Sequence, residues 1–308
     1  MYKTFEMELA GRTLRVDVGR VAKQANGAVL MHYGDTTVLC TATASEPRDG
    51  IDFFPLSVEY NERMYAVGKI PGGFNKREGK ASENAILTCR VIDRPMRPLF
   101  PKDYRNDVTL ENLVLSVDQD CSPELTAMLG AAIATTISDI PFDGPISTTQ
   151  VGLVDGEFVF NPTAAQKAVS DMALTVASTK EKVIMIEAGA KEVPEDKMIE
   201  AIFAAHELNQ KVIAFFDTIV AECGKKKHEY QSFAVPQELF DAIQEIVTPA
   251  EMEEAVFTDD KQTREENIRV ITEKLEEAFA DNEEWLAVLG EAVYQYQKKT
   301  VRKMILKD

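Results

Sequence analysis

The stretch Gly11–Thr43, GRTLRVDVGRVAKQANGAVLMHYGDTTVLCTAT, decides the fold of the first part of the chain. Apolar and polar residues alternate along it, and glycine-containing turns interrupt the alternation, which is typical of β-hairpins. One turn, at Ala10-Gly11, joins an upstream strand to the stretch, and a second turn surrounds Gly34. The strands predicted beside these turns are Phe5–Leu9, Thr13–Val18, Ala28–His32 and Thr37–Ala42. The stretch therefore predicts an antiparallel sheet near the N-terminus.

Further short strands follow downstream of this stretch. Asp155-Gly156 stands between two alternating segments, which predicts a tight hairpin. The additional strands expected are Phe54–Glu59, Leu110–Val117, Val151–Val154, Phe158–Phe160, Leu174–Ala177 and Val183–Ile186. The β-rich pattern therefore extends well beyond the middle of the chain.

Three helices are predicted among these strands. Ser82 is expected to cap a helix over Glu83–Asp93. Ser122-Pro123-Glu124 supplies a cap, a proline and a carboxylate for a first turn, and the small residues that follow indicate close packing on a sheet. A long helix is expected to follow Pro194 and to end near Gly224. Strands interspersed with helices predict an α/β (α+β) fold.

The C-terminal part of the chain has a different pattern. Lys225-Lys226-Lys227 marks a predicted boundary, so the expected domains are residues 1–227 and an all-α domain over residues 228–308. Helices are expected to start at Pro236 and Pro249 and to cover Arg264–Phe279 and Glu284–Ile305. Their apolar residues recur at helical spacing, which indicates a packed core, and their many carboxylates indicate a solvated face rather than a site.

The bulk composition narrows the class of protein. The 308 residues are 45% hydrophobic and 28% charged, which suits two packed domains. We expect no membrane span and a cytoplasmic location, because no apolar run of about 18 residues occurs and the N-terminus lacks a signal-peptide core. The four cysteines form no CxxC pair, which predicts reduced, buried thiols and no structural zinc. These are Cys40, Cys89, Cys121 and Cys223.

A basic segment from Lys69 to Arg105 stands out in a chain whose net charge is −17. It contains nine lysines and arginines against four carboxylates, so its local charge is 9 − 4 = +5. Its centre is Pro71–Pro101, PGGFNKREGKASENAILTCRVIDRPMRPLFP. Arginine forks and glycine backbone N–H groups both suit phosphate, so we expect a polyanionic ligand. The overall acidity argues against nonspecific coating of a duplex.

The loop that begins this segment is the main candidate site. Two glycines, Gly72 and Gly73, allow a ligand to approach the backbone closely. Phe74 offers a stacking face for a base, and the neighbouring cations suit the backbone of single-stranded nucleic acid. Those cations are Lys76, Arg77 and Lys80. The alternative is an ordinary flexible surface loop.

Three arginines follow the loop. Pro95 disfavours helical geometry at Arg94, so Arg90 is expected near the end of a helix, and Arg94 and Arg97 in an extended segment. The functional interpretation is a row of arginines that faces phosphate. The alternative for one of them is a local pair between Arg90 and Asp93.

The sequence signals for catalytic and metal-binding residues are weak. Asp118, Asp120 and Glu124 form a carboxylate trio that suits a divalent metal, but the dipole of a helix explains Glu124, and we favour a structural role. Asp171 has no nearby carboxylate partner. The three histidines have no metal or triad spacing, and His206 is expected to be buried and hydrogen-bonded. We therefore predict no catalytic and no metal-binding residue in this chain.

Several motifs together resemble the bacterial polynucleotide phosphorylase family, the polyribonucleotide nucleotidyltransferases. PGGFNKREGKASE at Pro71–Glu83 and TCRVIDRPMRPLFP at Thr88–Pro101 are similar to the N-terminal core of that family. The stretch Gly11–Thr43, IEAGAKEVPE at Ile186–Glu195 and TVRKMIL at Thr300–Leu306 extend the similarity over essentially the whole chain.

The resemblance implies a ribonuclease PH-like core with a ribosomal-protein-like β-α-β-β arrangement, followed by a small all-α domain. It implies 3′-to-5′ phosphorolysis of RNA, which releases nucleoside diphosphates and can run in reverse as polymerisation. Inorganic phosphate would be the co-substrate, and Mg²⁺ would offset the developing charge. Family members continue with a second core and with KH and OB-type RNA-binding domains. None of these is expected in this chain, which we interpret as a truncated N-terminal part.

The resemblance also implies that phosphate and Mg²⁺ are bound by the second core. Ser122-Pro123 stands where the active core has a serine pair, and Asp171–Thr175 reads Asp-Met-Ala-Leu-Thr where it has Asp-Met-Asp-Phe-Lys. Asn75 replaces a second phenylalanine of the RNA-guiding loop. The residues that match this loop are Gly72, Gly73, Phe74, Lys76 and Arg77. Arg90, Arg94 and Arg97 match arginines near the family's active-site cleft.

We therefore expect this chain to guide RNA and support a ring-shaped homotrimer rather than to catalyse by itself. Single-stranded RNA is the expected partner, and the resemblance adds degradosome-type partners such as an RNA helicase and an endoribonuclease. Two alternatives stay open: a noncatalytic RNA-binding ring-scaffold subunit and a metal-dependent hydrolytic nuclease. Diphosphate products would indicate phosphorolysis, and monophosphate products would indicate hydrolysis.

Overall fold

The structure is a computed structural model that describes residues 2–307. The chain divides into two compact units, Met1–Gln231 and Ser232–Asp308. The first unit combines strands and helices, and the second unit is helical. The division lies a few residues after the boundary that the lysine run at 225–227 predicts, because Lys227 donates hydrogen bonds to the carbonyl oxygens of Thr136 (2.9 Å) and Ser138 (2.8 Å) in the first unit.

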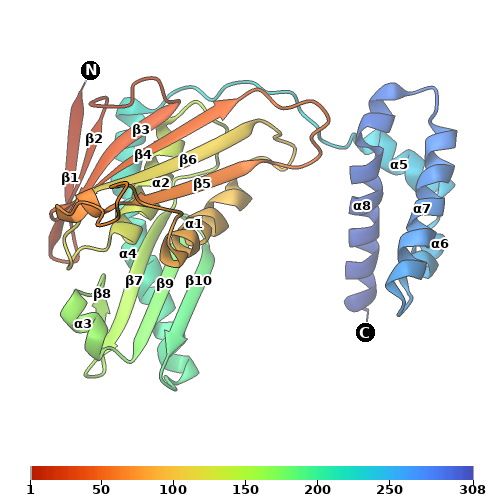
Figure 1. Ribbon diagram of the computed structural model, residues 1–308. Coiled ribbons are helices and arrows are strands. Elements are labelled where there is room, and N and C mark those ends of the chain that lie inside the picture. Colours follow the sequence, from red (N-terminus) through yellow and green to blue (C-terminus); the bar gives the residue numbers. More distant parts are fainter. Residues whose placement is uncertain (1, 308) are drawn as a thin grey trace. The chain divides into compact units, whose positions relative to one another are not determined.

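The larger sheet of the first unit has the strand order β1-β2-β3-β4-β6-β5 (Figure 1). Neighbouring strands are antiparallel except β5 and β6, which are parallel. The strands are β1 (Lys3–Leu9), β2 (Arg12–Val18), β3 (Gly27–Tyr33), β4 (Thr36–Ser45), β5 (Leu56–Glu62) and β6 (Asp107–Ser116). All strands predicted in this region are confirmed, with ends that differ by a few residues.

The smaller sheet has the order β10-β9-β7-β8 and is antiparallel throughout. Its strands are β7 (Ser147–Val154), β8 (Glu157–Phe160), β9 (Met172–Ser178) and β10 (Val183–Ala190), which confirms the four strands predicted here. Helix α4 (Glu195–Cys223) packs on β7 and β9 and ends at Gly224, as the sequence predicts. Its buried side includes Ala201, Ala205 and Val212.

Helix α2 (Pro123–Ile137) contacts both sheets and forms the centre of the first unit (Figure 1). Ser122 caps it, since its side chain accepts a hydrogen bond from the backbone of Leu125. A Cβ placed on Gly130 would lie 2.3 Å from the Sγ of Cys40 on β4, so only glycine fits this contact without a shift. The close packing expected from the small residues of this helix is confirmed.

Helix α1 (Glu83–Met96) starts at its predicted cap but ends later than predicted. Ser82 accepts a hydrogen bond from the backbone of Ala85. The helix continues through Pro95 into the 3₁₀ helix η2 (Arg97–Leu99), so the prediction of an extended segment here was wrong. Proline removes one helical hydrogen bond near a helix end, and burial of Pro95 and Met96 in the core offsets that cost.

One short helix, α3 (Ala164–Val169), has no counterpart among the predicted helices. Thr163 and Gln166 form a complete capping box at its start. The sequence therefore carries a local signal for this helix, because a threonine followed three residues later by a glutamine is typical of a helix N-terminus.

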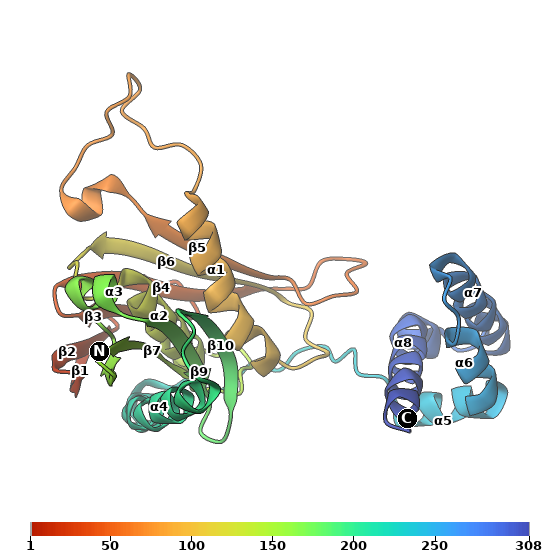
Figure 2. The ribbon, with the colours of Figure 1, turned by 90° about the horizontal axis from the view of Figure 1, so that it is seen from below.

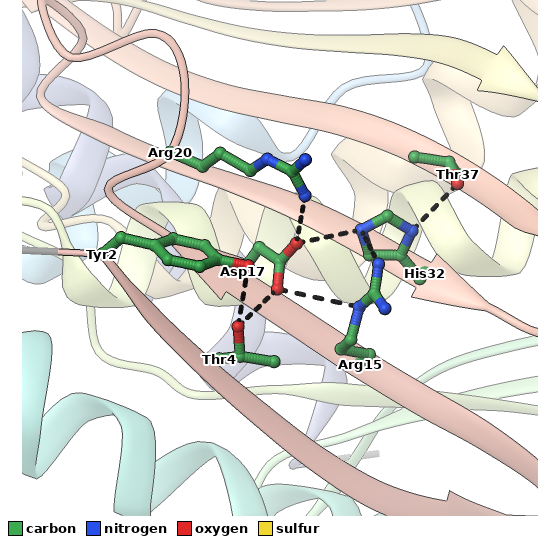
Figure 3. A network of polar contacts seen from close by, with 7 residues as sticks. All are labelled: Tyr2, Thr4, Arg15, Asp17, Arg20, His32 and Thr37. Atoms are coloured by element: carbon green, nitrogen blue, oxygen red, sulfur yellow. Dashed lines mark hydrogen bonds and ion pairs between the residues drawn. The ribbon is translucent and has the colours of Figure 1, made fainter.

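A buried carboxylate connects the first strands of the larger sheet (Figure 3). The side chain of Asp17 on β2 is fully buried and accepts a hydrogen bond from the hydroxyl of Thr4 on β1 (2.9 Å). The guanidinium groups of Arg20 and Arg15 lie 3.2 and 3.7 Å from its oxygens. Burial raises the pKa of Asp17, but hydrogen bonds from Thr4 and Tyr2 and the charge of Arg15 outweigh burial, so the pKa lies below its usual value.

His32 on β3 extends this network to β4 (Figure 3). Arg15 donates a hydrogen bond to Nε2 of His32 (3.0 Å), which makes that nitrogen an acceptor and places the ring proton on Nδ1, opposite the Thr37 hydroxyl (2.9 Å). Burial, followed by the charge of Arg15, lowers the pKa of His32, although Asp17 opposes this effect. The ring is therefore neutral, and its 3.3 Å contact with Asp17 is not an ion pair.

Two expectations for isolated side chains need correction. All four cysteines are free, but only Cys40 and Cys121 are buried, and Cys89 and Cys223 are half-buried. His206 is also half-buried rather than buried, because α4 turns its side chain toward the edge of its packed face; its ring nitrogens lie 3.4 Å from Nε2 of Gln210.

The second unit packs its helices around one apolar core. The helices are α5 (Gln237–Ile246), α6 (Pro249–Val256), α7 (Lys261–Ala278) and α8 (Glu283–Ile305). The predicted starts are confirmed, since Pro236 precedes α5 directly and Pro249 begins α6. The hydroxyl of Tyr296 on α8 donates to the carbonyl oxygen of Val247 (3.0 Å), which ties α8 to the end of α5. Within residues 2–307, no helix is long and apolar enough to cross a membrane.

Candidate nucleic-acid interface

The segment between the 3₁₀ helix η1 (Met64–Val67) and α1 protrudes from the first unit (Figure 2). Its base is fixed by Glu78, whose carboxylate accepts a hydrogen bond from the backbone of Met64 (2.6 Å) and pairs with Arg63 (3.4 Å). Arg63 anchors the loop and was missed by sequence reasoning, because a partner 15 positions away leaves no local signal. The pair holds both ends of the loop and leaves its tip free.

The tip carries the predicted stacking residue. Phe74 is 102% exposed, so its ring has no neighbour within the first unit that shields it. The backbone of Lys76 donates to the carbonyl oxygen of Gly73 (3.0 Å), and Lys76 has a positive φ of 50°, so residues 73–76 form a tight turn with Phe74 on its crest. A Cβ on Gly72 or Gly73 would meet nothing within 4 Å, which leaves the backbone open to a ligand.

The cations of the loop are available for a ligand. Lys76, Arg77 and Lys80 are exposed. Within residues 2–307, their side chains make no hydrogen bond and no ion pair. The structure therefore brings together the aromatic ring and the cations that the sequence predicts for an RNA-binding loop. A charge that has no partner in the protein is free to bind a phosphate at no cost of a broken ion pair.

The three arginines of α1 and η2 differ in what they contact. Arg90 is exposed, and nothing in the described chain pairs with it. Arg94 pairs with Glu187 on β10 (3.1 Å). Arg97 binds Asp93 (2.6 Å) and donates to backbone carbonyl oxygens at the start of β5, so its role is structural. The alternative of a local pair between Arg90 and Asp93 was wrong, since the carboxylate of Asp93 binds Arg97 one helical turn further on.

The carboxylates near α2 have hydrogen-bond partners within the first unit. Asp118 accepts a hydrogen bond from the backbone of Asp120 (2.9 Å), and this bond holds the pKa of Asp118 below its usual value. Asp120 accepts one from the backbone of Ala164 (3.1 Å). Glu124 accepts one from the hydroxyl of Ser122 (2.6 Å). Each carboxylate of the trio thus already has a hydrogen-bond partner in the fold.

A cleft of about 630 Å³ lies beside α1 and α2, over β9 and β10. It contains the positions that the resemblance identifies as degenerate, Met172–Thr175. Its polar lining comes from Asn84, Thr88, Glu124, Gln150, Lys167, Thr175 and Glu187. Gln150 contributes a buried amide oxygen without a hydrogen-bond partner. The cleft therefore has one cation, Lys167, against two carboxylates, whereas binding of inorganic phosphate needs a surplus of donors and positive charge.

Magnesium does not fit the residues that are present. Asp171, the remaining aspartate of the degenerate motif, pairs with the ammonium group of Lys191 (3.3 Å). Across residues 2–307, no three carboxylate, histidine or cysteine side chains come together as metal ligands. Mg²⁺ prefers several oxygen ligands in near-octahedral geometry, and a single ion-paired carboxylate does not supply them.

Three family models match the chain. The model described as "3′ exoribonuclease family, domain 1" matches residues 10–141, and "3′ exoribonuclease family, domain 2" matches residues 144–207. The model described as "Polyribonucleotide nucleotidyltransferase, RNA binding domain" matches residues 238–308. The first two models cover most of the first unit, and the third covers most of the second.

Solved structures support the fold of the first unit. A chain of an archaeal exosome core is similar with a TM-score of 0.51 and 16% identity, over 70% of this chain and 86% of that one. Rice (Oryza sativa) Rrp46 is similar with a TM-score of 0.54 and 14% identity, over 72% of this chain and 94% of that one. At such low identity, the likeness shows the fold alone, a ribonuclease PH-like α/β core.

Curated relatives match the whole chain. The polyribonucleotide nucleotidyltransferase of Lachnoclostridium phytofermentans is 79% identical over 310 aligned residues, and that of Ruminiclostridium cellulolyticum is 55% identical. Each alignment covers 100% of this chain and 44% of the relative, so the chain spans less than half the length of these relatives. Because identity this high extends from end to end through both units, the chain belongs to the polyribonucleotide nucleotidyltransferases of the 3′ exoribonuclease family.

Proposed function

We propose that this chain guides single-stranded RNA within a phosphorolytic 3′-to-5′ exoribonuclease and does not catalyse the reaction by itself. One observation carries the proposal: Phe74 stands fully exposed on the crest of a turn, and the nearby Lys76 and Arg77 are exposed and have no ion-pair partner among the described residues 2–307. A large aromatic ring exposed in this way has no role in the packing of the first unit.

The loop has the features that binding of single-stranded RNA requires. A base stacked on an aromatic side chain contributes about 1–3 kcal/mol without regard to sequence. Phosphates of the same strand would contact Lys76, Arg77 and Lys80. Arg90, near the loop on α1, is the further candidate, and the internal contacts of Arg97 remove it from the proposed interface. A fixed base with an open tip suits a strand that slides past it.

The catalytic steps would be carried out by segments of the relatives that lie outside the part matched by this chain. In the proposed enzyme, inorganic phosphate attacks the terminal phosphodiester of RNA and releases a nucleoside diphosphate. Mg²⁺ and phosphate would be bound by a second core, since the residues described above fit neither. Residues 1–227 would be the first core and residues 228–308 the helical domain of a cytoplasmic homotrimer, with degradosome-type proteins as further partners.

The loop is tested by RNA binding. We expect Phe74→Ala to weaken binding of a fluorescent oligo(A) to this chain by about 1–3 kcal/mol. We expect Lys76→Ala with Arg77→Ala to weaken it and to lower the salt dependence, because each lost phosphate contact reduces the slope by about 0.7.

The matched control removes two other exposed lysines, Lys182 in the β9–β10 turn and Lys211 on α4, with the same change in net charge. We expect the affinity of this control to stay near that of the unchanged chain. Equal affinity for the loop variants and the control at low salt would contradict the proposal.

A further inference from the structure

We propose that the C-terminal half of α8 forms a second contact surface for single-stranded RNA. The surface, here called the α8 face, consists of Tyr294, Lys298, Val301, Arg302 and Ile305. The inference deepens the proposed function, because it names another contact for the same class of ligand, but its residues belong to the other unit and carry the argument independently of the loop.

The charges of the second unit are distributed unevenly along its sequence. Residues 232–308 contain 18 aspartates and glutamates against nine lysines and arginines, a net charge of 9 − 18 = −9. Five of the nine basic residues fall within the last eleven positions: Lys298, Lys299, Arg302, Lys303 and Lys307. The sign of the charge therefore reverses locally at this end of the chain, as it does in the loop of the first unit.

The α8 face is a continuous stripe that points away from the core of its unit. Each of its residues lies three or four positions from another member of the face, so together they lie on one side of the helix. All five are exposed, and Tyr294 and Ile305 are 56% and 69% exposed. A shallow groove of about 410 Å³ runs along them. The opposite side of α8 supplies Val293 and Tyr296 to the buried core.

The two central cations of the α8 face are free, unlike Lys299 and Lys307 nearby. Lys299 lies over the ring of Phe240 (3.8 Å to its centroid), and Lys307 pairs with Glu253 (3.6 Å). In the part of the chain that the structure describes, the side chains of Lys298 and Arg302 make no hydrogen bond or ion pair. They are one helical turn apart, with Tyr294 one turn before them.

Local helix energetics explain only part of this arrangement. Positive charge in the last turn is stabilised by the helix dipole, which accounts for Arg302 and Lys303. The dipole effect is confined to that turn, so it does not account for Lys298. It also gives no reason for an exposed tyrosine ring among cations.

Single-stranded RNA fits this set of groups. The exposed Tyr294 ring offers a platform for a base, and Lys298 and Arg302 offer charge to the phosphates beside it. An acidic polypeptide would bind the two cations but would leave the Tyr294 ring unused. The acidic remainder of the unit would repel such a polypeptide as strongly as it repels RNA. The family model that matches residues 238–308 is described as an RNA binding domain, and the α8 face is the surface of that unit with matching chemistry.

The experiment measures binding of fluorescent oligo(A) to the 308-residue chain at several salt concentrations. We expect Lys298→Ala with Arg302→Ala to lower the affinity several-fold and to reduce the salt slope by about 0.7 for each lost contact. We expect Tyr294→Ala to lower the affinity at least about 5-fold. Lys261→Ala with Arg269→Ala on α7 is the control, since it removes two charges from the acidic side of the same unit.

A second set of variants, made in a chain whose loop is already altered, tests the α8 face independently of the loop. In a chain that carries Phe74→Ala, Lys76→Ala and Arg77→Ala, we expect the α8 substitutions to remove most of the residual binding. Loss with the loop variants but none with the α8 variants would overturn this inference and leave the proposed function intact. If the alanine variants fail to fold by circular dichroism, Lys298→Gln with Arg302→Gln replaces them, and unchanged affinity there is equally contradictory.

Discussion

At the scale of single residues, the first unit depends on a network of charges and hydrogen bonds that its sheet encloses. Asp17 is ionised although it is buried, and His32 is neutral although a carboxylate lies beside it. Four strands supply the partners, so no short stretch of sequence contains the network. For this reason the three histidines carry little information as a sequence pattern, whereas the structure gives His32 a definite tautomer and neighbours.

The neutral state of His32 predicts a pH dependence of stability. Because the folded pKa lies below the unfolded value of about 6.5, the unfolded chain binds more protons as the pH falls through that region, and stability decreases. We expect the free energy of unfolding in urea to fall from pH 7.5 to pH 5.5. His32→Gln should lose part of this decrease, and His206→Gln should keep it.

A fall of equal size in His32→Gln and in the unchanged chain would contradict the assigned state of the ring.

Asp17 affects stability in a separate, lower pH range. Its folded pKa lies below the unfolded one, so its contribution is present above about pH 4 and is lost as the pH falls further through the folded value. The two residues can therefore be told apart by pH alone.

At the scale of elements, local signals predict most of the strands and helices of this chain. Alternation marks the strands, and Ser82 and Ser122 mark helix starts through caps that the structure confirms. The order of the strands was not predictable, since β5 pairs in parallel with β6 across the intervening helix α1. The end of α1 was mispredicted because tertiary burial of Pro95 outweighs its local preference.

The contact between α2 and β4 gives a test at this scale. Gly130→Ala places a Cβ 2.3 Å from the Sγ of Cys40. Alanine favours a helix by about 1 kcal/mol over glycine, but overpacking of a core costs about 1–3 kcal/mol. We expect a net loss of stability in chemical denaturation.

Gly290→Ala on α8 is the matched control, because nothing lies within 4 Å of its added Cβ and the position is an exposed helix interior. It should stabilise the second unit by up to about 1 kcal/mol. A Gly130→Ala chain as stable as the unchanged one would show that the core tolerates a methyl group there.

At the scale of the whole molecule, the chain combines surfaces suited to RNA with a cleft in which one cation, Lys167, is outnumbered by two carboxylates. The loop was predictable from sequence because its aromatic ring, glycines and cations are contiguous. The internal contacts of Arg94 and Arg97 were not, since Glu187 and the start of β5 lie far from them in sequence. The α8 face escaped notice because its acidic surroundings dominate the composition of the second unit.

The central claim, that this chain guides RNA and does not cleave it alone, is tested most directly by product release. The purified 308-residue chain is incubated with poly(A), phosphate and Mg²⁺, and nucleoside diphosphate is measured. Electrostatic stabilisation of the transferring group is usually the largest catalytic term. The segment Asp171–Thr175 has neither the lysine nor the second aspartate that the resembling family has in its active core. We therefore expect no diphosphate until a second core is supplied. Steady release of ADP by the chain alone, after rigorous removal of host enzymes, would contradict the account.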